Sequence, residues 1–182
     1  MSTAKTLLTA EDLFAMDTDQ RYELVKGELV DMPPSPGSLH GNVASRILGF
    51  LLIHGEFKGL GKTFGAETGF RIERNPDTVR AADAAFVARD RLPPGKLPEG
   101  YLDLTPDIVV EVVSPSDTRK RVQAKVADWL RTGARLVLVF YPRTETVMVY
   151  RSLTDVKILT LEDVLGGAPV LPGFSVPVKE LF

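Results

Sequence analysis

The chain has 182 residues, no cysteine and only two histidines, His40 and His54. The lack of cysteine excludes disulfide bonds, thiolate catalysis and zinc sites with sulfur ligands. Two histidines are too few for a histidine-rich metal centre. A metal site would therefore depend on carboxylates and on a hard cation such as Mg²⁺ or Mn²⁺.

Long apolar runs and an excess of basic residues are also missing. No run approaches the ~20 apolar residues that cross a bilayer, which predicts a cytoplasmic protein with no membrane partner. Lys and Arg number 22 against 24 Asp and Glu, so the net charge is −2. A protein that holds nucleic acid through bulk charge is basic, so nucleic-acid binding here would have to be local or metal-assisted.

The composition that is present is that of a folded protein. Hydrophobic residues make up 44% and charged residues 25% of the chain, which excludes disordered and fibrous classes. The length predicts a single domain over residues 1–182. We expect its core at about 38–151, with a C-terminal tail at 160–182 packed on it.

The strongest local pattern is a strand, a helix and a second strand between residues 106 and 141. The segment PDIVVEVVSPSD, residues 106–117, surrounds Glu111 with β-branched residues, which is typical of a strand buried on both faces. Ser116 or Asp117 is expected to cap the helix, and residues 136–141 form a second apolar run. A strand, helix and strand in so short a span predict a right-handed crossover between parallel strands.

Periodicity predicts further elements on both sides of this unit. Before it we expect a helix near residue 10, a hairpin with strands at 21–25 and 28–32, a long helix capped by Ser38 and ending near Gly55, and antiparallel strands at 62–64, 68–72 and 79–87. After it we expect strands at 146–150 and 156–159. The predicted fold class is α/β with a mixed central sheet.

Two acids, Asp83 and Glu111, stand isolated in apolar segments. A buried carboxylate costs several kcal/mol unless a lysine or a metal ion compensates its charge. Neighbouring strands could bring both acids to one cation, so a metal site and a structural ion pair are about equally supported by the residues alone. Asp107 lies ~13 Å from Glu111 at ~3.3 Å per residue, too far to share an ion. We therefore interpret Asp107 as a strand-start residue.

Several motifs, taken together, resemble the Uma2 family within the PD-(D/E)XK nuclease superfamily. They are Asp83, the segment EVVSPS at 111–116, Lys125, the segment RYELVKGEL at 21–29, and His40 at the start of the long helix. The resemblance covers about residues 10–160. It implies a restriction-endonuclease-like core, αβββαβ, with an N-terminal helix and β-hairpin added.

The resemblance further implies a Mg²⁺-dependent endonuclease that hydrolyses phosphodiester bonds in DNA. Asp83, Glu111 and the main-chain carbonyl of Val112 would hold Mg²⁺ or Mn²⁺, and Glu23 and His40 would be further site residues. Cutting two strands favours a homodimer. We expect an apolar edge such as residues 146–150 to serve as its interface.

The sequence departs from the superfamily pattern at the motif lysine, whose position is held by Val113. The resemblance implies that Lys125, on the following helix, supplies the amine instead; a solvated helix lysine is the alternative. Glu23 alternates with Tyr22 and Leu24 as a solvent-facing strand residue would. It enters as a site residue only through the resemblance.

Two other functions compete with the nuclease. A non-catalytic module that binds nucleic acid or a protein partner is favoured by Val113 in the lysine position. A glycoside hydrolase needs two acids across a cleft with aromatic platforms, and the chain has one Trp, which we interpret as a core residue. Two groups of basic residues could face phosphate, although solvated charge is the usual explanation of such groups: residues 119–121 with Lys125 and Arg131, and Arg71 with Arg74 and Arg80.

Overall fold

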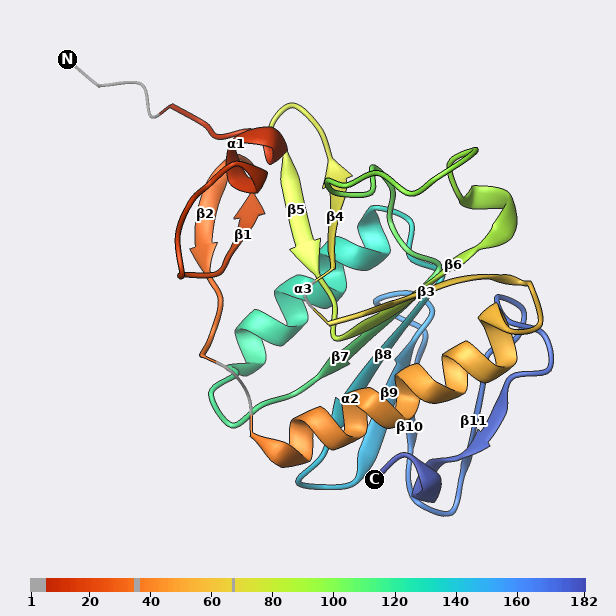
Figure 1. Cartoon of the computed structure of the whole chain (residues 1–182). Helices are drawn as coiled ribbons and strands as arrows, with labels where there is room; N and C mark the ends of the chain where they lie inside the picture. The colour runs from red at the N-terminus through yellow and green to blue at the C-terminus, as the bar shows by residue number, and fades with distance from the viewer. Residues whose placement is uncertain (1–5, 35–36, 67) are drawn as a thin grey trace.

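The computed structural model describes residues 6–34, 37–66 and 68–182 (Figure 1). Its centre is a six-stranded mixed sheet with the strand order β10-β9-β8-β7-β6-β3. Strands β7 (Ile108–Val112) and β8 (Leu136–Tyr141) are parallel and are joined by helix α3 (Arg119–Arg131), as the crossover pattern predicted. The antiparallel strands of this sheet are β3 (Gly61–Gly65), β6 (Ala84–Ala88), β9 (Thr146–Tyr150) and β10 (Val156–Leu159).

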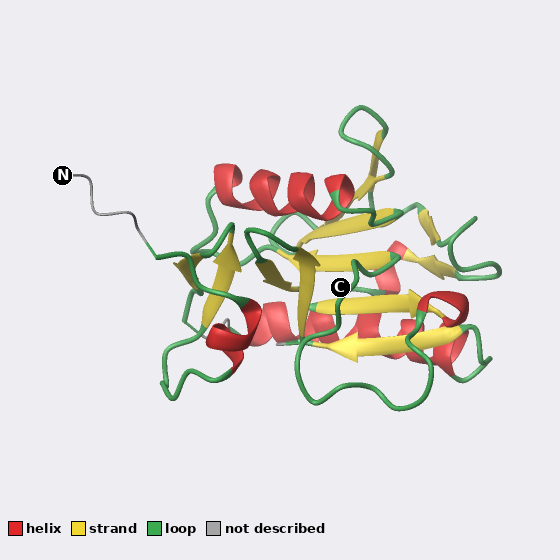
Figure 2. Cartoon of the chain, turned by 90° about the horizontal axis from the view of Figure 1, so that it is seen from above, coloured by secondary structure: helices red, strands yellow, loops and turns green. Residues whose placement is uncertain are grey.

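One helix layer covers each face of this sheet, as the edge view in Figure 2 shows. Helix α2 (Ser38–Leu51), which continues into a π-helical turn η1 (Leu52–Glu56), buries its apolar stripe on one face. Helix α3 packs on the other face through Val122, Val126 and Trp129. The β-branched residues of β7 alternate between these two cores, which explains why its apolar run is continuous. Trp129 is fully buried.

A second, four-stranded sheet has the order β2-β1-β5-β4 and lies beside α3. It contains the predicted hairpin, β1 (Tyr22–Val25) and β2 (Glu28–Asp31), together with β4 (Gly69–Glu73) and β5 (Thr78–Ala81). Lys26 and Gly27 form the hairpin turn with φ values of 51° and 78°. This is the positive-φ turn that matches strand twist. Helix α1 (Ala10–Phe14) packs on this sheet.

The predicted single strand at 79–87 and the predicted meander are wrong. Strand β5 ends at Ala81 and β6 begins at Ala84, and the two strands belong to different sheets. Strand β3 pairs with β6, while β4 pairs with β5 as an inserted hairpin. The chain changes sheets at Asp83, whose main-chain N–H donates to the Val110 carbonyl at 3.0 Å. Asp83 therefore lies between two strands and not within one. The core order survives as α2, β3, β6, β7, α3, β8.

Smaller corrections concern helix caps and the sheet edge. Ser38 is the first residue of α2 and follows the cap residue Gly37. Thr118, not Ser116 or Asp117, caps α3 by accepting a hydrogen bond from the Arg121 main-chain N–H. Residues 146–150 are not an edge, because β9 lies between β8 and β10.

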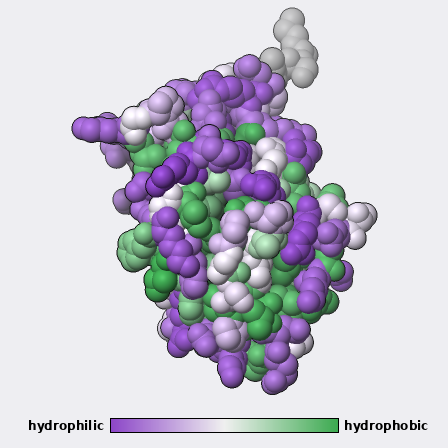
Figure 3. Space-filling model, turned by 90° about the vertical axis from the view of Figure 1, so that its right-hand side faces the viewer, coloured by the Kyte–Doolittle hydropathy of each residue, from purple (hydrophilic) through white to green (hydrophobic). Residues whose placement is uncertain are grey.

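The C-terminal segment forms a small hairpin from β11 (Val164–Gly166) and β12 (Ser175–Pro177), followed by a 3₁₀ turn η3 (Val178–Glu180). Its apolar side chains join the core under α2. A further 3₁₀ turn, η2 (Arg89–Arg91), follows β6. On the face in Figure 3, apolar residues are more frequent in the middle and lower part, and polar residues cover the top. Within the described ranges, no helix is long and apolar enough to cross a membrane.

Candidate active site

One cavity of about 350 Å³ brings together all of the site residues suggested by the sequence. They are contributed by β1, α2, the β5–β6 junction, β7 and α3: Glu23, His40, Asp83, Glu111, Val112 and Lys125. The cavity lies where the two sheets meet, at the carboxyl end of β7. The change of sheet at Asp83 is what opens this end of the central sheet to the second sheet.

Asp83 is held by contacts to β7 and α2. Its Oδ2 accepts a hydrogen bond from the Val112 main-chain N–H at 2.7 Å and lies 3.4 Å from His40 Nε2. Burial alone would lower the pKa of His40, but the Asp83 carboxylate and the main chain of Val112 outweigh burial and raise that pKa. His40 is therefore an electrostatic partner of Asp83 and orients its carboxylate.

Glu111 points from β7 toward α3, where two donors meet its carboxylate. Trp129 Nε1 donates to Oε1 at 2.8 Å, and Lys125 Nζ donates to Oε2 at 2.7 Å. Burial raises the pKa of Glu111 to about 7; the charge of Lys125 opposes this rise and that of Asp83 adds to it. The carboxylate is thus held in position while its negative charge is only partly compensated.

Lys125 reaches the same carboxylate from the middle of α3. Its Nζ also donates to the Ala81 carbonyl at 3.1 Å and lies 3.5 Å from Glu23 Oε1. Burial would lower the pKa of Lys125, but Glu111 and Glu23 outweigh it and raise that pKa, so the amine stays charged. The structure therefore places an ammonium group beside Glu111, although Val113 occupies the motif lysine position and packs toward the α3 core.

Glu23 is not a solvent-facing strand residue, and this expectation was wrong. The residue is 2% exposed, and its carboxylate accepts from the Ala81 main-chain N–H at 3.1 Å and from Arg80 Nη1 at 2.7 Å. Burial opposes ionisation, but Lys125 and Arg80 lower the pKa of Glu23 below its ordinary value. Glu23 is thus a fixed buried anion at the wall of the cavity.

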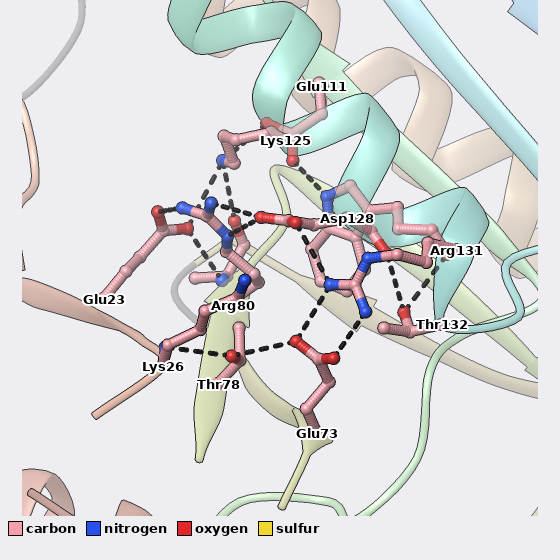
Figure 4. A network of polar contacts seen from close by, with 12 residues as sticks. Glu23, Lys26, Glu73, Thr78, Arg80, Glu111, Lys125, Asp128, Arg131 and Thr132 are labelled. Carbon is pink, nitrogen blue, oxygen red and sulfur yellow. Dashed lines mark hydrogen bonds and ion pairs between the residues drawn. The ribbon is translucent and has the colours of Figure 1, made fainter. Parts of the chain in front are cut away.

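A network of charged side chains extends from this anion along α3 (Figure 4). Arg80 bridges Glu23 and Asp128, and Arg131 bridges Asp128 and Glu73. Asp128 was not among the residues predicted from the sequence, and Arg80 was offered either as part of a phosphate-facing surface or as solvated charge, yet the Arg80 side chain is only 7% exposed. A signal was available, because Arg80, like Glu111, is a charged residue in an otherwise apolar run.

Of the remaining charged candidates, Arg121 lines the cavity, whereas Asp107 and Arg71 lie outside it. Asp107 is fully buried, accepts a hydrogen bond from the Ala88 main-chain N–H at 2.8 Å, and pairs with Arg91 at 2.9 Å, which agrees with a structural role at the start of β7. Arg71 pairs with Glu11 and Asp103. These contacts neutralise basic groups that the sequence suggested for phosphate binding.

A hard cation fits the oxygen donors at the cavity wall. Across residues 6–34, 37–66 and 68–182, no three His, Asp or Glu side chains gather as a ready-made metal cluster. Asp83, Glu111 and Val112 nevertheless line one cavity, so two carboxylates and a main-chain segment lie around the same space. Mg²⁺ is commonly held by one or two carboxylates while it keeps several waters, so this donor set suits it.

The central mixed sheet lies between two helix layers, and the cavity at the end of β7 is lined by two acids and a lysine. This arrangement is that of a restriction-endonuclease-like fold. A crystal structure described as "a putative nuclease belonging to DUF820" from Anabaena variabilis ATCC 29413 superposes with a TM-score of 0.81. The match has 18% identity and covers 96% of this chain and 97% of that chain, which shows the shared fold. Among curated proteins, none matches the chain significantly.

The family follows from the sequence match. The model of the Uma2 family, described as "Putative restriction endonuclease", matches residues 10–179, and the chain belongs to this family. Family and fold together support a nuclease function.

Proposed function

We propose that the protein is a metal-dependent endonuclease that hydrolyses phosphodiester bonds in DNA. The observation that carries the proposal is the convergence of Asp83, Glu111, Val112 and Lys125 on one cavity from three parts of the fold, namely the β5–β6 junction, β7 and α3. Glu111 is buried with its charge only partly compensated and Asp83 lines the same cavity, so a cation bound between the two carboxylates would stabilise both. Family and fold point to the same class of reaction.

In this mechanism Asp83, Glu111 and the Val112 carbonyl would hold Mg²⁺ or Mn²⁺, which polarises a scissile phosphate and lowers the pKa of a bound water. Lys125 would donate a hydrogen bond to the attacking water or to a phosphate oxygen as negative charge develops. His40 keeps the Asp83 carboxylate oriented by their 3.4 Å contact. Trp129 does the same for Glu111 through its indole N–H.

The acids can be tested by removing charge without changing shape. Asp83→Asn and Glu111→Gln are each expected to weaken Mg²⁺ binding in calorimetry and to lower plasmid nicking at least about a hundredfold, because a catalytic metal contributes several kcal/mol. Glu73→Gln is the control, since Glu73 pairs with Arg131 outside the cavity. Wild-type protein that binds neither Mg²⁺ nor Mn²⁺ at millimolar concentration would refute the proposal.

The pH dependence of metal binding follows from the raised pKa of Glu111, about 7 in the folded protein. A proton and a cation compete for this carboxylate, so metal binding should tighten as pH rises through about 7 and release a proton below that pH. Calorimetry in two buffers of different ionisation enthalpy measures the proton released. Equal affinity at pH 6 and pH 8 would contradict the expectation.

The alternative is a module that keeps the fold and binds nucleic acid or a protein partner without cleavage. Val113 in the motif lysine position favours it, whereas Lys125 Nζ at 2.7 Å from Glu111 favours the enzyme. DNA binding without nicking in either metal would identify the module. A homodimer remains part of the proposal; because β9 is internal, a sheet-to-sheet interface would use β10 or β3. Location in the cytoplasm stays a prediction.

A further inference from the structure

Lys125 has two sets of acceptors, one on each side of the cavity. On the β7 side its Nζ donates to Glu111 Oε2 at 2.7 Å. On the side of the second sheet it contacts the Ala81 carbonyl at 3.1 Å and Glu23 Oε1 at 3.5 Å. The ammonium group therefore lies between an acid that the proposed metal would use and an acid that it would not.

These two acids differ in which groups hold them: Trp129 and Lys125 donate to Glu111, whereas Glu23 has donors besides Lys125 on both of its oxygens. Both Glu23 oxygens have donors from β5, the Ala81 N–H and the Arg80 guanidinium, and Arg80 is itself fixed by Asp128. Glu23 thus presents a fixed negative charge that no local rearrangement removes. Glu111 Oε2, in contrast, has Lys125 as its hydrogen-bond donor.

A cation bound to Glu111 would repel the ammonium group that now occupies Oε2, because like charges at such a distance oppose each other. A lysine without a second anchor would then either resist the metal or swing out of the cavity. The short distance to Glu23 Oε1 offers an alternative that keeps the amine buried and charged.

We infer that Glu23 is a positioning residue: it takes up the Lys125 ammonium group when Glu111 binds the metal, and so keeps the amine beside the reacting phosphate. This role rests on the proposed metal site. It also gives a function to the second sheet. Glu23 and Ala81 of that sheet provide the second set of contacts for the Lys125 ammonium group.

The test is a double-mutant cycle measured as Mg²⁺ and Mn²⁺ affinity in calorimetry, with the thermal transition of each variant recorded. Glu23→Gln removes the charge of the second anchor and is expected to weaken metal binding about tenfold. In a Lys125→Met background there is no ammonium group to relocate, so adding Glu23→Gln should change the affinity less than about threefold. Glu23 acts through Lys125 only if the effect disappears in this background.

Glu73→Gln is the matched control, because it removes the charge of one glutamate in the same network without contacting Glu23, Arg80 or Lys125. It should leave metal affinity unchanged. If Glu23→Gln shows no cooperative transition, Glu23→Asp, which keeps the charge with a shorter reach, replaces it and should give a smaller loss of affinity.

The outcomes separate the two proposals. Wild-type affinity in Glu23→Gln, or an equal loss in the Lys125→Met background, overturns the positioning role while the metal site stands. Wild-type protein that binds no metal overturns the metal site and the positioning role with it.

Discussion

Replacing Lys125 with methionine is expected to lower plasmid nicking in Mg²⁺ by about 10²- to 10³-fold, the usual cost of losing one donor to a developing negative charge. Methionine keeps the length and apolar stem of the side chain but removes the ammonium group that lies 2.7 Å from Glu111. Single-turnover nicking at saturating metal measures the chemical step, so a change in metal affinity does not obscure the result.

Lys120→Met is the control for this prediction. Lys120 lies one turn and a half earlier on the same helix, is exposed, and does not line the cavity. It removes the same charge and should leave the chemical step unchanged. If both variants lose nicking equally, general attraction of DNA explains the effect; if neither does, Lys125 is only a counterion for Glu111.

The position of α3, which carries Lys125, shows which part of the fold could be predicted from the sequence. The continuous β-branched run of β7, the α3 periodicity and the apolar run of β8 left one arrangement, a right-handed crossover, and this placed α3 against the face from which Glu111 projects. Lys125 on that helix was a candidate for the amine only through the family resemblance. These are local patterns of period 2 and 3.6, which can be recognised without knowledge of distant partners.

Other features depend on contacts between segments far apart in the sequence. The break between β5 and β6 carries no glycine or proline, and the alanines at 81, 82, 84 and 85 read as one apolar strand. The two strands are separated because Asp83 pairs with β7. Its hydrogen-bond partner there, Val112, is 29 residues away in the sequence. Neither periodicity nor turn chemistry contains that information.

Glu23 was misread for the same reason. Alternation in a hairpin predicts one buried and one solvent-facing side, but it cannot show that residues of β5 and α3 contact the side chain on the polar side. The compensating charge, Arg80, is 57 residues away in sequence. A buried acid and a buried base at such separation each look like surface residues until the fold brings them together.

Arg80→Met is expected to lower the free energy of unfolding by about 3–5 kcal/mol, the cost of leaving buried charges without their partner. Arg80 is 6% exposed and stands between Glu23 and Asp128, so methionine would leave Glu23 with the more distant charge of Lys125 and the Ala81 N–H, and would remove the Arg80 partner of Asp128. Urea denaturation at pH 7, with an unchanged dependence on denaturant, measures the loss.

Arg131→Met provides the comparison within the same network. Arg131 pairs with Glu73 and Asp128, but its side chain is 50% exposed, and water can solvate the acids that it leaves. A pair of this kind contributes about 0–1 kcal/mol. A small loss of stability for Arg131→Met and a large one for Arg80→Met would show that burial, and not the number of ion pairs, determines how strongly this network holds the second sheet on α3. Equally small losses for both variants would mean that apolar packing holds the second sheet on α3. The position of Lys125 would then not depend on the charges beside it.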